Sequence, residues 1–224
     1  LGDVYKRQAG ENGHEVWLYE KNDRLGRKLF ITGKGRCNIT NAGDMETLFA
    51  SVMSNPKFLY SSFYTFTNDQ VIDFFEELGV RTKIERGNRV FPLSDHSSDV
   101  IAGLKRRLET LGVRICLETE VEKIEGKDGK FQAIVLKGGQ RKTGDACIVA
   151  TGGISYPATG STGDGYRFAK ENGHQITKLY PALVPMEVRE WYAKELQGLS
   201  LRNVSAAVYD GKKKLYEAVS YTHL

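Results

Sequence analysis

The sequence predicts an α/β fold in which helices alternate with strands, followed by a β-meander and by the start of a second, β-rich domain. Two observations support this prediction. At four places a helical pattern ends in glycine, and an apolar, β-branched segment follows at once. Glycine readily adopts the left-handed conformation that terminates a helix. After residue 181 the pattern changes to short strands. The four glycines are Gly13, Gly79, Gly112 and Gly173.

Helices and strands follow from this pattern in order. Two of the helices that end at these glycines carry apolar residues at helical spacing. Asn68 or Asp69 is expected to cap the first of them, and Ser97 or Ser98 the second, because short polar side chains accept hydrogen bonds from the free N–H groups of a first turn. The strands expected after the four glycines are residues 15–20, 80–84, 113–117 and 175–179.

Antiparallel pairing is expected in two further places. A hairpin that turns at Arg86-Gly87 joins residues 81–85 to residues 88–92. A β-meander with glycine-containing turns comes next, and a strand at residues 200–209 precedes a turn at Gly211. The strands of the meander are residues 121–125, 131–137 and 146–150.

These elements divide the chain into two domains. Residues 9–185 form the first domain, and residues 186–218 begin the second. The ends, LGDVYKRQ at residues 1–8 and VSYTHL at residues 219–224, resemble sequences foreign to a folded domain and are expected to be non-native extensions. The chain is therefore expected to be a fragment that lacks the first βα unit of its fold.

The composition excludes several classes of protein. Apolar residues at 40% and charged residues at 27% are typical of a globular domain and not of a disordered chain. The 32 Lys and Arg residues exceed the 28 Asp and Glu residues by only four, which argues against a strongly basic nucleic-acid-binding domain. No apolar run reaches the roughly 20 residues of a membrane span, and no signal segment stands at the N-terminus. We therefore expect no membrane association and a cytoplasmic location.

The cysteines and histidines predict neither a disulfide framework nor a metal site. The three cysteines include no CxxC pair, and the four histidines have no metal-ligand spacing. Cys37 has no second cysteine nearby that would resolve a disulfide, so its expected role is packing.

The first motif with a chemical meaning is the strand that ends in Glu20. In a dinucleotide-binding unit, an acidic residue at the end of the second strand accepts hydrogen bonds from ribose hydroxyls. The glycine-rich turn that should precede it by about 20 residues is absent from this sequence. Taken alone, a glutamate at a strand end such as Glu20 is more often a solvated carboxylate.

The second motif, RLGRKLFITGKGRCNITN at residues 24–41, concentrates glycines and cations directly after that strand. Glycines let backbone N–H groups approach a phosphate, while lysine and arginine neutralise its charge. The motif does not satisfy the GxxxxGK[ST] pattern of a Walker loop. A flexible basic surface loop that touches nucleic acid is the alternative, and the residues alone do not separate the two.

The third motif has two glycine-rich parts. DACIVATGG at residues 145–153 predicts a buried strand that ends against a ligand, and TGSTGDG at residues 159–165 opens a helix at residues 166–172. Bare backbone at Thr151-Gly152-Gly153 would let a cofactor lie close. A tight turn without a ligand is the alternative, although the density of glycines argues against it.

Together these motifs resemble the BaiN/RdsA family of NAD(P)/FAD-dependent flavoproteins, over residues 9–218. The resemblance implies a Rossmann-like FAD/NAD(P)-binding three-layer fold with an inserted β-rich second domain. It assigns Glu20 to the adenosine ribose, residues 26–38 to the pyrophosphate and the isoalloxazine, and Val121 to the adenine. The cofactor-binding residues that it implies are Glu20, Lys21, Gly26, Arg27, Lys28, Thr32, Gly33, Lys34, Gly35, Arg36, Cys37, Asn38, Val121, Ala150, Thr151, Gly152 and Gly153.

By this resemblance the chain is part of an oxidoreductase in which FAD takes hydride from NAD(P)H and passes it to an electron-poor double bond. The substrate is a small molecule or a uracil of RNA, and a flavin amine oxidase is a further reading. Lys34 or Arg36 would stabilise negative charge on the reduced ring, while Tyr156 and Asp164 are the side chains to inspect as acids or bases. Without the first βα unit, the fragment is expected to bind FAD poorly and to be inactive.

The rival hypothesis is a cofactor-free RNA-binding module. It would use the basic loop together with the aromatic residues Phe30, Tyr60 and Tyr64. The nearly balanced charge of the chain argues against it.

Overall fold

The computed structural model describes residues 9–181, 187–199 and 204–220. The chain divides into two compact units, Leu1–Thr177 and Lys178–Leu224, which we describe separately. The extension expected at residues 1–8, the domain boundary expected at residue 185 and the last four residues all lie outside the described ranges.

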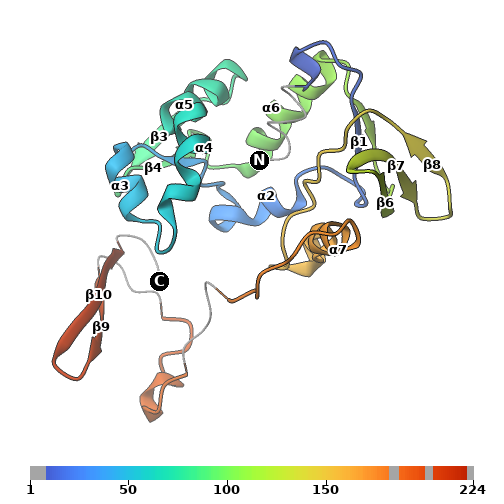
Figure 1. Ribbon diagram of the computed structural model, residues 1–224. Coiled ribbons are helices and arrows are strands. Elements are labelled where there is room, and N and C mark those ends of the chain that lie inside the picture. The colour runs from blue at the N-terminus through green and yellow to red at the C-terminus, as the bar shows by residue number, and fades with distance from the viewer. Residues whose placement is uncertain (1–8, 182–186, 200–203, 221–224) are drawn as a thin grey trace. The chain divides into compact units, whose positions relative to one another are not determined.

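The first unit is an α/β structure, as the sequence predicts (Figure 1). Strand β1 (Trp17–Tyr19) pairs in parallel with β5 (Arg114–Cys116), and Leu18 lies opposite Ile115. Leu18, Leu108 and Val113 form a buried cluster beneath this pair. Parallel strands need a crossover between them, and the intervening residues supply the helices described next.

The two predicted helices are present, but their caps differ from the expectation. Helix α5 (Asn68–Glu77) is capped by Thr67, whose hydroxyl accepts from the Gln70 N–H while the Gln70 side chain accepts from the Thr67 N–H. This reciprocal capping box satisfies two N–H groups at once, which neither Asn68 nor Asp69 does.

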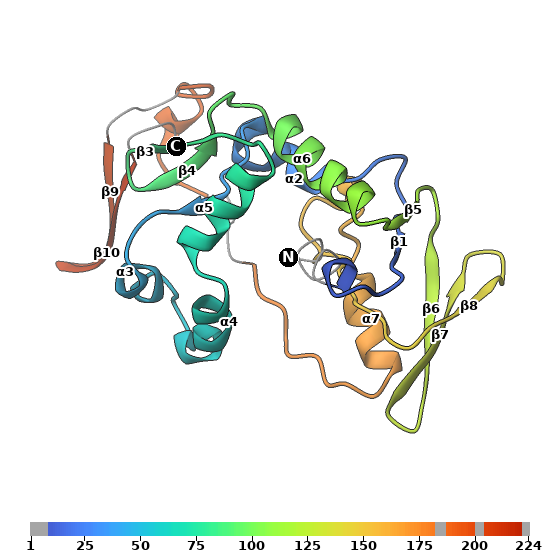
Figure 2. The same ribbon diagram turned by 90° about the horizontal axis from the view of Figure 1, so that it is seen from above.

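Helix α6 (Ser97–Thr110) begins after His96, which makes no side-chain cap. Ser97 is buried, and its hydroxyl donates to the backbone oxygen of Phe30 (2.8 Å), so neither Ser97 nor Ser98 is the N-cap. Phe30 belongs to α2 (Arg27–Ile31), and Figures 1 and 2 show α2 and α6 next to each other. The serine therefore serves a tertiary contact in place of a cap.

The predicted hairpin is confirmed as β3 (Thr82–Glu85) and β4 (Arg89–Pro92). Strand β2 (Thr40–Asn41) adds to the other edge of β4 and closes a three-stranded antiparallel sheet. Three short helical segments that the sequence pattern does not predict lie between β2 and α5. They are α3 (Met45–Ala50), η2 (Pro56–Leu59) and α4 (Tyr60–Thr65).

The β-meander is confirmed, but its third strand lies elsewhere. Strands β6 (Val121–Lys127) and β7 (Lys130–Leu136) pair as expected, and β8 (Arg141–Thr143) pairs with β7 at once after the Gly138-Gly139 turn. A tight turn places the residues directly after it beside β7, so the polar residues 141–143 take the position expected for residues 146–150. The prediction placed the third strand at residues 146–150 because they are apolar, whereas the register set by the turn decides which residues pair with β7.

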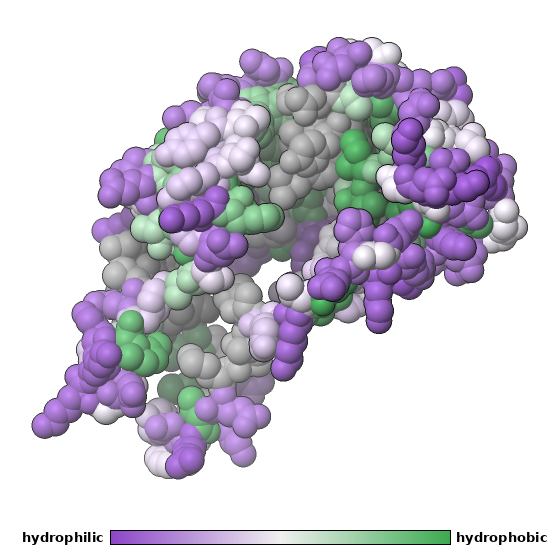
Figure 3. Space-filling model, in the orientation of Figure 1, coloured by the Kyte–Doolittle hydropathy of each residue, from purple (hydrophilic) through white to green (hydrophobic). Residues whose placement is uncertain are grey.

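Residues 146–150 are exposed and form no strand with any described part of the chain. The expected burial of this segment is therefore wrong for the structure described here, since Ile148 is 44% and Val149 48% exposed. In Figure 3 the visible face is mostly hydrophilic, with apolar patches between the polar side chains.

Helix α7 (Asp164–Glu171) begins after Gly163, close to the expected start. All four helix-ending glycines have positive φ, between 70° and 86°, as their position after a helix predicts. Three of the four following segments contain a strand, but residues 175–179 do not. The strand predicted at residues 175–179 is therefore wrong, and this segment pairs with no described strand.

The second unit contains η4 (Trp191–Ala193) and a hairpin of β9 (Val204–Asp210) and β10 (Lys213–Ser220). The hairpin turns at Gly211 (φ 57°), as predicted, and its register shifts between Lys214 and Tyr216. Residues 219 and 220, which were expected to belong to the C-terminal extension, pair with β9 as the end of β10.

Candidate functional site

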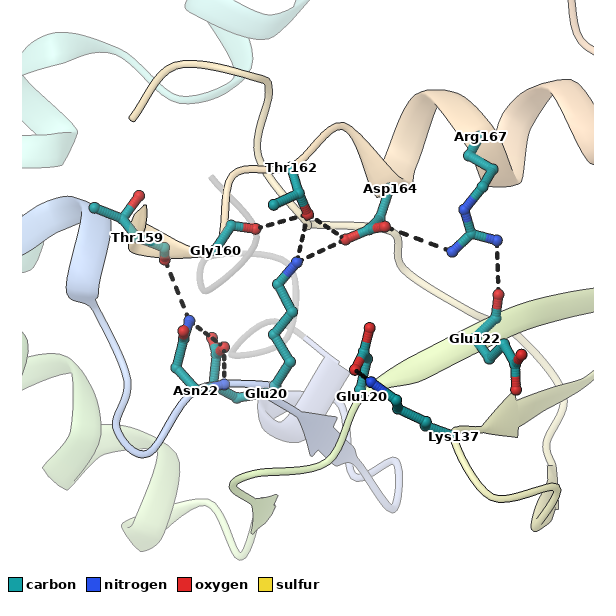
Figure 4. Close-up of polar contacts among 11 residues, drawn as sticks. Glu20, Asn22, Glu120, Glu122, Lys137, Thr159, Gly160, Thr162, Asp164 and Arg167 are labelled. Atoms are coloured by element: carbon teal, nitrogen blue, oxygen red, sulfur yellow. Dashed lines mark hydrogen bonds and ion pairs between the residues drawn. The ribbon is translucent and has the colours of Figure 1, made fainter. Parts of the chain in front are cut away.

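The end of β1 meets the glycine-rich segment that precedes α7, although about 140 residues of sequence separate them (Figure 4). Lys21 follows β1, and its Nζ donates to Thr162 Oγ1 (2.5 Å) and to Asp164 Oδ2 (2.7 Å). The Thr162 hydroxyl donates to the same carboxylate oxygen (2.8 Å). The structure thus joins the first and third sequence motifs. Lys21 forms an ion pair with Asp164, and the Thr162 hydroxyl forms hydrogen bonds with both side chains.

Burial and hydrogen bonding act in opposite directions on Asp164. Desolvation raises its pKa, but hydrogen bonds from Lys21 and Thr162 outweigh this effect and hold the pKa below the usual value of 3.8. Asp164 is therefore ionised at neutral pH and fully engaged in its ion pair, which does not suit it to the role of an acid or base.

Glu20 lies at the same junction. Its Oε1 accepts from the backbone N–H of Asn22 (2.8 Å) and from Asn22 Nδ2 (2.7 Å). Asn22 Nδ2 also donates to the backbone oxygen of Thr159 (3.2 Å), and Arg27 Nη1 donates to Asn22 Oδ1 (3.1 Å). The Glu20 backbone oxygen accepts from the N–H of Thr119 (2.9 Å), which brings the start of β6, and hence Val121, alongside.

The first half of the basic loop faces the same junction. Lys28 Nζ donates to the backbone oxygen of Ser155 (3.2 Å) and lies 4.2 Å from the ring centroid of Tyr156. Gly26 precedes α2 with φ 74°, and a Cβ atom there would lie 2.8 Å from Ile101 Cγ1. Only glycine meets both demands, so the sequence places the start of α2 tightly against α6.

The second half of the loop turns to the β3–β4 hairpin instead. Arg36 donates to the carboxylates of Glu85 and Asp95, with 2.6 Å between its Nη2 and Asp95 Oδ1, and its guanidinium lies 4.1 Å from the ring centroid of Phe91. Lys83 adds a second cation to Asp95 (2.6 Å). The sequence did not indicate these partners, because pairing across about 50 residues depends on the tertiary fold.

The ion pairs of Arg36 with Glu85 and Asp95 affect the choice between Lys34 and Arg36 as the cation suggested for the reduced ring. The Arg36 hydrogen bond holds the pKa of Glu85 below its usual value, and Lys83 and then Arg36 do the same for Asp95. Arg36 is thus balanced by carboxylates, whereas Lys34 is exposed. Of the two residues suggested to stabilise a reduced ring, Lys34 remains the better candidate.

The backbone between these two halves is unusual. Gly33, Lys34, Gly35 and Cys37 all have positive φ, at 56°, 58°, 86° and 60°. For lysine and cysteine this conformation is strained, and strain of this kind is retained where the surrounding structure enforces it.

The structure buries Cys37 but leaves Asn38, the next residue of the loop, exposed. Burial among Val80 and Val100 raises the pKa of the Cys37 thiol, in agreement with a packing role. The Thr32 hydroxyl donates to the Leu29 backbone oxygen (2.6 Å), and Asn38 is exposed.

The segment from Ala150 to Gly153 carries one unsatisfied polar atom. Among the described residues, Thr151 Oγ1 is buried and has no hydrogen-bond partner. A Cβ atom on Gly165 would lie 2.7 Å from this hydroxyl, and Gly152 has φ 74°. A buried hydroxyl without a partner is costly, and a hydrogen bond to a bound ligand or water is one way in which that cost is met.

A hollow of about 550 Å³ lies between the β6–β7 hairpin and α7, lined among others by Ile124, Cys147 and Phe168. None of the predicted cofactor residues lines it. Across the described ranges, no three His, Cys, Asp or Glu side chains group as a metal site. No helix in those ranges is long and apolar enough to cross a membrane.

The sequence motifs gave no role to Asn22, and they included Thr159 and Thr162 only as members of the glycine-rich stretch at residues 159–165. Asn22 stands two residues after Glu20, a spacing at which asparagine commonly folds back on its neighbours, and this was the available signal. Nothing in the sequence indicated the contact of Thr159 with Asn22, because only the Thr159 backbone oxygen takes part.

Comparison with known proteins gives a family match and several relatives. Residues 5–216 match the family described as HI0933-like protein Rossmann domain. The chain is 33% identical over 178 residues to a 3-dehydro-bile acid delta(4,6)-reductase of Clostridium scindens, covering 79% of this chain and 42% of that protein.

Two further relatives are named ribosomal RNA dihydrouridine synthase. The one from Haemophilus influenzae is 28% identical, covering 96% of this chain and 54% of that protein. The one from Escherichia coli is 29% identical, covering 86% and 47%. The chain spans about half the length of the curated relatives it matches.

Proposed function

Because this chain belongs to the HI0933-like Rossmann-domain family, we propose that it forms the FAD-binding part of an oxidoreductase that carries hydride from NAD(P)H to an electron-poor carbon–carbon double bond. The flavin supplies the redox chemistry when bound. The residues of this chain bind and orient it.

The observation that carries the proposal is the junction of β1, α2 and the glycine-rich segment. An acidic side chain at a strand end, cations at a helix start and bare backbone at Ala150 to Gly153 are the groups that a dinucleotide needs for its ribose, phosphates and ring. Asn22 links Glu20 to the Thr159 backbone, and Lys28 donates to the backbone oxygen of Ser155, with each of these hydrogen bonds 3.2 Å or shorter. The unsatisfied Thr151 hydroxyl supports a ligand there.

Each group has a separate role in this proposal. The Glu20 carboxylate accepts hydrogen bonds from the adenosine ribose, and Lys34 offers positive charge near the flavin ring. Backbone at Gly152 and Gly153 lets the cofactor approach without steric hindrance. Arg27 and Lys28 neutralise phosphate charge.

The substrate class follows from chemistry that the names of the relatives share. A 3-dehydro steroid with double bonds at positions 4 and 6 has its alkene conjugated to a carbonyl group. Uridine, which becomes dihydrouridine, likewise has its ring double bond conjugated to a carbonyl group. Such a bond accepts hydride at the carbon remote from the carbonyl. Neither name describes amine oxidation, so the amine oxidase reading is not carried further.

The two candidate substrates for the protein are thus a small enone and a uracil of ribosomal RNA. The nearly balanced charge of the chain favours the enone, while two relatives named for RNA favour the uracil. Oxidation of NADPH or NADH by the full-length protein, followed at its near-ultraviolet absorbance with FAD present, distinguishes them when a 3-oxo-4-ene steroid and a uridine-containing RNA are compared.

Because the chain alone is expected to bind FAD poorly, cofactor binding is tested by titrating the full-length protein that contains this chain with FAD and following flavin fluorescence. Glu20→Ala removes hydrogen bonds to a charged acceptor, which typically costs about 1.5–3 kcal/mol, a roughly tenfold to hundredfold loss of affinity. Glu15→Ala, an exposed carboxylate just before β1, is the control and should leave affinity unchanged. A protein that binds no FAD would refute the proposed function, and equal affinity for both variants would refute the role of Glu20.

A further inference from the structure

Asn22 connects three parts of the candidate site through one side chain, and Figure 4 shows two of these connections, to Glu20 and to Thr159. Its Nδ2 group has two hydrogens, and the two acceptors within reach are Glu20 Oε1 (2.7 Å) and the Thr159 backbone oxygen (3.2 Å). Its Oδ1 accepts from Arg27 Nη1 (3.1 Å). Because donors face acceptors on both ends of the amide, the orientation of this side chain is fixed by its partners.

The space around Asn22 is fitted to it as well. Gly160 has φ 98°, and a Cβ atom there would lie 2.7 Å from Asn22 Nδ2. The backbone oxygen of Asn22 accepts from the Glu118 N–H (2.9 Å), which holds the main chain in place. The glycine-rich segment thus approaches β1 as closely as it does only because residue 160 has no side chain.

These contacts hold the Glu20 carboxylate through one of its two oxygens. Both hydrogen bonds from Asn22 reach Oε1, and in the described ranges no group donates to Oε2. A carboxylate held by one oxygen keeps the other directed and available for a hydroxyl group, at little further cost in side-chain entropy.

We propose that Asn22 is the positioning residue of the cofactor site: it aims the Glu20 carboxylate at the adenosine ribose and couples that contact to the closure of Thr159-Gly160 over β1. This inference rests on the proposed function, because it requires a ribose at Glu20. Asn22 itself does not touch the cofactor in this proposal.

The test uses Asn22→Asp, which keeps the size of the side chain but replaces the Nδ2 donor by an acceptor 2.7 Å from Glu20 Oε1. Like charges this close repel, so FAD affinity should fall roughly tenfold to hundredfold at pH 8.

A second readout separates positioning from a general loss of structure. FAD is compared with its analogue that lacks the 2′-hydroxyl of the adenosine ribose. The wild type should prefer FAD, and Asn22→Asp and the uncharged Asn22→Ser should lose that preference. Asn12→Asp, the same change at an exposed position, should keep it.

The outcomes are distinguishable. All these variants are made in the full-length protein that contains this chain. Full-length wild-type protein that does not bind FAD refutes the proposed function and the inference with it. Wild-type protein that binds FAD but does not discriminate against the analogue, or Asn22 variants that discriminate as well as the wild type, overturns the inference and leaves FAD binding intact. Unchanged FAD affinity of Asn22→Asp at pH 8 also overturns it.

Discussion

Replacing Lys21 by methionine removes the cation that joins the end of β1 to the start of α7 while keeping most of the side-chain volume. The Lys21 and Asp164 side chains are only 26% and 25% exposed, and their atoms are 2.7 Å apart. Asp164 then keeps Thr162 Oγ1 (2.8 Å) and the more distant Arg167 (3.5 Å) as partners. The change leaves the Asp164 carboxylate, which is three-quarters covered, with weaker hydrogen bonds to offset the cost of its burial.

The magnitude follows from this geometry. Hydrogen bonds to charged groups contribute about 1.5–3 kcal/mol, and exposed ion pairs about 0–1 kcal/mol. A pair that is three-quarters covered falls between these ranges, so Lys21→Met should cost about 1–2 kcal/mol. At about 2–4 °C per kcal/mol for a chain of this size, the thermal midpoint should fall by roughly 2–8 °C.

The pH dependence gives a second measure of the same contact. A carboxylate whose pKa is lowered on folding contributes stability above its unfolded pKa and loses it as the pH falls through the folded value. Asp164 has such a lowered pKa, partly through Lys21. Wild-type stability should therefore decline as the pH falls below about 4, and Lys21→Met should show a smaller decline because part of that stability is already gone.

Thermal melts followed by circular dichroism at pH 7, pH 5 and pH 3 measure both effects. Lys105→Met is the matched control, because Lys105 pairs with Glu109 at 3.7 Å between side chains more than half exposed. This control should stay within about 0.5 kcal/mol of the wild type. If both variants melt alike and follow the same pH profile, the ion pair between β1 and α7 does not stabilise the protein.

Three further predictions concern the loop and the glycine-rich segment. Cys37→Ser should destabilise the fold by about 1–2 kcal/mol, because it buries a hydroxyl in an apolar cluster, and the wild-type thiol should resist alkylation until the protein unfolds. Gly160→Ala should weaken FAD binding at least tenfold, since φ 98° and the contact with Asn22 both exclude a Cβ atom; FAD titration with unchanged affinity would contradict this. Arg36→Gln should lower the thermal midpoint most at neutral pH and less as the pH falls through the lowered pKa values of Glu85 and Asp95, because the stability that these carboxylates gain from Arg36 is lost there.

The sequence predicted the elements whose signals are local. Gly79 and Gly112 each end a helix, and Arg86-Gly87 turns a hairpin, because backbone conformation at a glycine depends on a few neighbouring residues. The helix caps were predicted less well. Thr67 competes with Asn68 and Asp69 as a cap on nearly equal terms, so that sequence alone does not choose among them.

The predicted site residues separate into two groups in the structure. Lys21 contacts the glycine-rich segment, Glu20 is linked to it through Asn22, and Lys28 contacts Ser155 just before it. Arg36 faces the β3–β4 hairpin instead. One continuous basic motif therefore serves two surfaces. Whether the first group binds FAD stays a prediction, which the titrations described above test.

By itself the sequence determined the α/β class, the family and the kinds of residue that gather near β1, because periodicity, glycine positions and motif order are properties of the linear chain. Only the tertiary structure decided which of those residues meet. Lys21 pairs with Asp164 and Asn22 reaches Thr159 across about 140 residues, and β8 takes the place expected for residues 146–150. Such choices depend on strand register and on distances between distant segments, which no local pattern encodes.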